Sequence, residues 1–135
     1  MTWFSAFSAK KKKQTGSRGE DAACRFLEQD GFTIVDRNVG NKRGYAVGEI
    51  DIIARKDDRI FFVEVKTRTQ TYKSMLPPEM SITREKIHKL HRAIDRYRTR
   101  NREIATLPYQ LDAIVVIYNR DGSLQSIRRL EHIFL

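Results

Sequence analysis

The chain has 135 residues, enough for one domain with a single core, and its 40% hydrophobic and 32% charged residues exclude an extended disordered chain. No apolar run approaches the roughly 20 residues of a membrane helix, and the one cysteine, Cys24, fits a reducing cytoplasmic setting better than a disulfide framework. The net charge of +9, from 26 Lys and Arg against 17 Asp and Glu, favours nucleic acid as partner, because neutralised phosphates release counterions.

The chain divides into an arm and a domain. Residues 1–17 are expected to form a flexible basic arm, since Lys10–Lys13 is followed by polar residues and glycine with no apolar period. Residues 18–135 are expected to form one domain. Its predicted elements are a helix that begins at 17–20 and ends near 30, strands over 32–38, 48–55 and 60–68, a helix over about 79–101, a strand over 111–118, and a last strand or tail over 123–135.

Three patterns support this order. The strands 48–55 and 60–68 are rich in β-branched and aromatic residues and flank the polar tetrapeptide 56–59, which suits a tight hairpin. The segment 79–101 has apolar residues at helical spacing. Residues 111–118 are almost continuously apolar, as in a strand buried on both faces. The sequence therefore predicts an α/β fold, a mixed sheet flanked by helices in the order α-β-β-β-α-β-β.

The central hairpin carries the most informative polar residues. Residues two apart on a strand share a face, so Glu64 and Lys66 lie together. If the hairpin is symmetric about its turn, Asp51 lies directly opposite Glu64, roughly 5 Å away between Cβ atoms, and Glu49 faces Lys66. Exposed cross-strand salt bridges are one interpretation. The apolar character of both strands favours a site, because charges on central strands are costly otherwise.

Such a pair of acids predicts a particular chemistry. Two carboxylates held close together repel each other unless one takes up a proton or a cation lies between them. Oxygen ligands without thiolates favour a hard ion, Mg²⁺ or Mn²⁺. Lys66 beside the pair could hold an attacking water or neutralise charge that grows on a phosphate.

The hairpin resembles a known motif. G-E-I-D-I-I-A followed by F-F-V-E-V-K-T-R is similar to the PD-(D/E)XK nuclease motif, with Asp51 as its first acid and Glu64-Val65-Lys66 as its E-x-K. Over about residues 16–118 the chain resembles the YraN-type family of small bacterial nuclease-like proteins. The positions that carry this likeness are Gly16, Gly19, Glu20, Ala23, Arg37-Asn38, Glu79, Lys86 and Asp112.

The resemblance implies a fold similar to restriction endonucleases and to archaeal Holliday junction resolvases, which suggests a homodimer by analogy. It implies that Asp51 and Glu64 bind Mg²⁺ or Mn²⁺ and that Lys66 is the catalytic lysine. Glu20 matches an acid that resolvases place near the metal, although a helix-start acid favoured by the helix dipole explains it equally well. Glu49 is either a further metal ligand or a salt-bridge partner of Lys66.

The expected function is therefore a metal-dependent endonuclease that cuts DNA, with branched or junction DNA as candidate substrates. The alternatives are a non-catalytic DNA- or RNA-binding module on the same fold and an RNA- or ribosome-associated protein. Basic residues on the long helix either follow a phosphate backbone or form a solvated face. They are Arg84, Lys86, Lys89, Arg92 and Arg96. Asp112, inside an apolar strand, needs a partner: an arginine or a role in the site.

Overall fold

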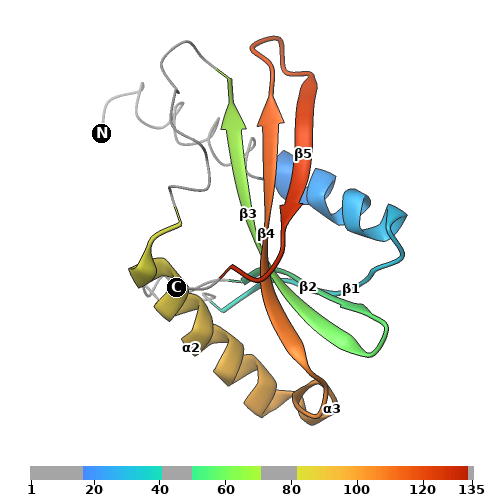
Figure 1. The fold of residues 1–135 in the computed structure, drawn as a ribbon, viewed down its shortest axis with the longest axis vertical. Coiled ribbons are helices and arrows are strands. Elements are labelled where there is room, and N and C mark those ends of the chain that lie inside the picture. The colour runs from blue at the N-terminus through green and yellow to red at the C-terminus, as the bar shows by residue number, and fades with distance from the viewer. Residues whose placement is uncertain (1–16, 41–49, 71–81, 134–135) are drawn as a thin grey trace.

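A computed structural model describes residues 17–40, 50–70 and 82–133 of the chain, and within these ranges it forms one five-stranded sheet flanked by helices (Figure 1). The strands lie in the order β1-β2-β3-β4-β5. Their bounds are β1 Thr33–Val39, β2 Ile50–Lys56, β3 Arg59–Thr69, β4 Tyr109–Tyr118 and β5 Leu124–Leu130. The helices are an N-terminal helix over 17–29, α2 Arg84–Arg100 and the short α3 Arg102–Ala105. The predicted fold class and element order are confirmed.

The sheet is mixed. Strands β3 and β4 run parallel, whereas the other neighbouring pairs are antiparallel. Parallel neighbours need a long crossover, and α2 provides it on one face of the sheet while the N-terminal helix covers the other (Figure 1). Strand β4, which lies between β3 and β5, is buried along most of its length on both faces, as its apolar run predicts.

Two hydrophobic clusters form the core, one on each face. On the side of the N-terminal helix, Leu27 and Phe32 pack with Phe61 and Val63 of β3. On the side of α2, the buried helix positions at helical spacing pack with Ile60 and Phe62 of β3 and with residues of β2 and β4. These helix positions are Ile87, Leu90, Ala93, Ile94 and Tyr97. The strict alternation along β3 therefore places Glu64 on the α2 face.

The central hairpin has the predicted register. Ile53 pairs with Phe62 and Arg55 with Ile60, so the hairpin is symmetric about its turn. Both turn residues, Asp57 and Asp58, have positive φ angles of 51° and 59°. Such angles are typical of the two-residue turns whose twist matches that of the flanking strands, and aspartate tolerates them better than most residues.

The structure corrects some predicted boundaries. Helix α2 does not include residues 82 and 83, because Thr83 is its N-cap: its side chain accepts a hydrogen bond from the backbone N–H of Lys86. Helix α3 was not predicted, and β4 begins two residues earlier than expected. The basic arm, apart from residue 17, and Glu49 lie outside the described residues. Among those described, no helix is long and apolar enough to cross a membrane.

Candidate functional site

The site lies where β2 and β3 stop pairing. The last backbone pair between these strands is Ile52 with Val63. Beyond it, the backbone N–H of Val65 donates a hydrogen bond to Oδ2 of Asp51, at 2.8 Å. The carboxylate of Asp51 therefore takes a hydrogen bond that a strand carbonyl would otherwise accept, and this contact holds Asp51 beside the E-x-K segment. The predicted approach of Asp51 to Glu64 follows from this geometry.

Glu64 is the most buried acid of the site, with 3% of its surface exposed. Two lysines from different elements contact the same carboxylate oxygen. Nζ of Lys86, from α2, lies 2.5 Å from Oε1 of Glu64, and Nζ of Lys66, two residues along β3, lies 3.7 Å from it. Two acids and two lysines thus converge here, and their formal charges cancel when all four are ionised.

The surroundings of Asp51 strongly disfavour its negative charge. Burial is the main cause and the charge of Glu64 the next, and together they raise the pKa of Asp51 to about 8 from 3.8. A hydrogen bond with Glu64 and the charge of Glu20 act in the same direction, whereas the hydrogen bond from Val65 opposes them. Without a bound cation, Asp51 therefore keeps its proton at neutral pH.

The pKa values of the two lysines shift in opposite directions. Burial lowers the pKa of Lys66, and the neighbouring Lys86 lowers it further. Burial also opposes the charge of Lys86, but its hydrogen bond to Glu64 and the charge of Glu64 outweigh this effect, so the pKa of Lys86 is raised. Lys86 is therefore the principal cationic partner of Glu64.

Glu20 approaches the site from the N-terminal helix. Its charge raises the pKa of Asp51. Its Oε2 atom lies 3.8 Å from the guanidinium Nη2 of Arg37 in β1, and the same nitrogen is ion-paired with Oδ1 of Asp21 at 2.8 Å. The backbone of this helix lies directly against β3, because a Cβ atom at Gly19 would meet Oγ1 of Thr67 at 1.9 Å. A glycine at position 19 therefore sets how closely Glu20 can approach the end of the sheet.

The remaining basic residues predicted to bind nucleic acid stay on the outside of α2. Lys89 pairs with Glu85 at 3.6 Å. Arg84 and Arg92 line a shallow hollow of about 590 Å³ with Glu85 and His88, and Arg96 is exposed. Lys86 alone of the five reaches the acid pair. The sequence marks Lys86 by its part in the family resemblance and by its position just before the buried Ile87, at the edge of the apolar stripe. Neither signal indicates which strand residue the lysine meets.

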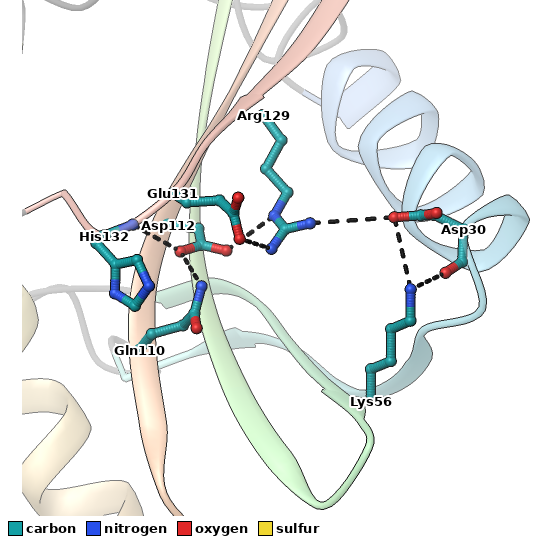
Figure 2. Close-up of polar contacts among 7 residues, drawn as sticks. All are labelled: Asp30, Lys56, Gln110, Asp112, Arg129, Glu131 and His132. Carbon is teal, nitrogen blue, oxygen red and sulfur yellow. Dashed lines mark hydrogen bonds and ion pairs between the residues drawn. The ribbon is translucent and has the colours of Figure 1, made fainter.

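Asp112 lies outside the site. It is fully buried, and it shares the face of Val63 and the N-terminal helix rather than that of Glu64. Figure 2 shows its partners: Arg129 Nε donates to Oδ2 at 3.0 Å, and Gln110 Nε2 and the backbone N–H of His132 donate to Oδ1. The arginine pair that the sequence left open is therefore the correct alternative, and this network ties β5 and the residues after it to the core.

The acid pair fits a hard divalent cation. Magnesium is commonly bound through one or two carboxylates, with water completing its coordination shell. A cation would also remove the cause of the raised pKa of Asp51, since its charge would offset both burial and the neighbouring acid. Within the described ranges, no three His, Cys, Asp or Glu side chains are grouped to hold a metal ion. In that part of the chain, Asp51 and Glu64 are the two carboxylates that could hold such an ion together.

Fold and site together define a small mixed α/β domain with an acid–lysine centre at the end of its central hairpin. The chain belongs to the family described as "Uncharacterised protein family UPF0102", whose model matches residues 19–116, and this is the YraN-like family that its motifs resemble. A UPF0102 protein of Desulfosudis oleivorans is 42% identical over 118 residues, which cover 87% of this chain and 89% of the relative. A UPF0102 protein of Campylobacter fetus is 35% identical over 112 residues, which cover 83% of this chain and 91% of the relative.

Proposed function

We propose that this protein is a divalent-metal-dependent endonuclease of the PD-(D/E)XK type that hydrolyses phosphodiester bonds in DNA. The observation that carries the proposal is the convergence of Asp51, Glu64 and Lys66 at the point where β2 and β3 separate. Restriction endonuclease-like and junction-resolving proteins share the order of helices and strands that the motif implies. Branched or junction DNA is therefore the first substrate to test, and a homodimer the expected assembly by analogy.

Each residue has a distinct role in this proposal. Asp51 and Glu64 hold Mg²⁺ or Mn²⁺, with Glu20 or Glu49 as further candidate ligands. When bound, the ion supplies Lewis-acid stabilisation of the phosphate and makes a water molecule more acidic. Lys66 contacts the phosphate and stabilises the charge that grows on its oxygens. The hydrogen bond from Val65 fixes the Asp51 carboxylate and so keeps the pair in place before the ion arrives.

A cleavage assay tests this proposal. Purified wild-type protein is incubated with branched and linear DNA and Mg²⁺ or Mn²⁺, beside Asp51→Ala and Lys66→Ala. Asp58→Asn and Lys89→Ala are matched controls, because they remove the charge of an acid and of a lysine that lie outside the site. We expect cleavage by the wild type and both controls and at least 100-fold less by the two site variants. Undiminished cleavage by Asp51→Ala would refute the assignment of the site.

The alternative is a nucleic-acid-binding module without cleavage. The observation that favours it is that Glu64 already has two lysines beside it, so that its charge is compensated without a metal ion. Binding without cutting by all the proteins would support this alternative, and an RNA substrate would then be tested. Neutralising Arg92 and Arg96 should weaken binding and lower its salt slope by about 0.9 for each lost phosphate contact. An unchanged slope would make this face of α2 a solvated surface.

A further inference from the structure

We propose that Lys86 is a built-in counter-ion of Glu64 that a divalent cation must displace, so that the Lys86 side chain leaves Glu64 when the Asp51–Glu64 pair is loaded. This inference rests on the proposed function, because it concerns how the same site takes up its metal. It gives α2 a part in the site, in addition to its place in the core.

The contacts of Glu64 carry the inference. Its Oε1 atom lies 2.5 Å from Nζ of Lys86 and 3.7 Å from Nζ of Lys66, and the side chain is only 4% exposed. Nζ of Lys86 is within hydrogen-bond distance of Oε1, whereas Nζ of Lys66 is not, so a cation that binds Oε1 competes directly with Lys86. Lys86, the closer of the two lysines, is therefore the one whose ammonium group the cation displaces.

The backbone of Lys86 is fixed, which confines the change to its side chain. Its N–H donates to Oγ1 of Thr83 at 3.2 Å, in the N-cap of α2, and the next residue, Ile87, is buried in the core. The long aliphatic stem of a lysine is flexible, so its ammonium group can move several ångströms while the helix stays in place. Displacement of Lys86 therefore requires no refolding of α2.

The electrostatic effect is large enough to measure. A divalent ion about 4 Å from an ammonium group is repelled enough to weaken its binding by about 10- to 30-fold, even with the screening of water. Lys66 is farther from Glu64 and belongs to the proposed catalytic set, so the removable part of this repulsion comes from Lys86. Loss of the Lys86 charge should therefore tighten cation binding, which is the reverse of what loss of a ligand would do.

The test is calorimetric titration of Mn²⁺ into the full chain without nucleic acid. We expect Lys86→Met to bind Mn²⁺ about 10-fold more tightly than the wild type, and Lys86→Arg, which keeps the charge, to stay within threefold. Lys89→Met is the matched control on the same helix, since Lys89 pairs with Glu85 instead of Glu64. It should also stay within threefold of the wild type.

The outcomes separate the inference from the proposed function. If Lys86→Met binds Mn²⁺ with unchanged or lower affinity while Asp51→Asn abolishes binding, the metal site stands and the counter-ion role fails. If none of the proteins binds Mn²⁺, both fail.

A second measurement uses the wild type alone and so does not depend on how the variants fold. Saturating Mg²⁺ should raise the rate at which acetic anhydride labels Lys86, read by mass spectrometry, by at least threefold and leave Lys89 unchanged. Equal labelling of Lys86 with and without Mg²⁺ would overturn the inference.

Discussion

The protonated state of Asp51 makes the stability of the metal-free protein depend on pH in an unusual direction. Its pKa is about 8 in the folded protein and 3.8 in the unfolded chain. Between these pH values the folded chain therefore binds a proton that the unfolded chain has released. Stability then falls as pH rises through this window. Most carboxylates behave in the opposite way, because native contacts usually lower their pKa. Asp51→Asn removes the effect while keeping a side chain of similar shape.

The magnitude follows from the shift. Each pH unit within the window changes the free energy of unfolding by about 1.4 kcal/mol. The interval from pH 5 to pH 7 lies within this window and spans two pH units, so the titration of Asp51 alone should lower the free energy of unfolding of the wild type by about 3 kcal/mol. Titrating groups away from the site contribute equally to both proteins. The loss of stability between these pH values should therefore be about 3 kcal/mol greater in the wild type than in Asp51→Asn.

Urea denaturation at pH 5 and pH 7, with a metal chelator present and fluorescence as the probe, measures this difference. Asp58→Asn is the control, because Asp58 lies in the exposed turn of the same hairpin. It should behave like the wild type. Equal changes with pH in the wild type and Asp51→Asn would show that Asp51 is ionised in the folded protein, and the argument from burial and Glu64 would be wrong.

Two further predictions concern packing around the site. Gly19→Ala should lower the free energy of unfolding by about 1–3 kcal/mol, because the new Cβ would meet Thr67, although alanine favours helix. The double variant Gly19→Ala with Thr67→Ala should recover part of this loss. A Gly19→Ala protein as stable as the wild type would contradict the close approach of the helix to β3. Arg129→Met should cost about 3–5 kcal/mol in thermal or urea unfolding, because it leaves the buried Asp112 without its charged partner, and adding Asp112→Leu should reduce that cost. An Arg129→Met protein within 1 kcal/mol of the wild type would refute the role of this pair.

Much of the fold was predictable from the sequence alone. The period-2 alternation of the hairpin and its polar turn predicted the register, and the register relates the positions of Asp51, Glu64 and Lys66 to one another. The apolar run of β4 predicted a strand buried on both faces, and the helical spacing of apolar residues predicted the core face of α2. These features depend on neighbours in sequence or on one hairpin, and local periodicity describes such relations directly.

Only the tertiary structure decided which distant residues join the acid pair. Lys86 is separated from Glu64 by 22 positions, and its place at the edge of the apolar stripe of α2 does not indicate which strand residue it meets. Similarly, Asp112 lies next to Val63 in the sheet but on the opposite face from Glu64, and its partner Arg129 comes from the last strand. The parallel crossover through α2 and the order of the strands fix these contacts, because a helix residue meets a strand only after both have packed on the same face of the sheet.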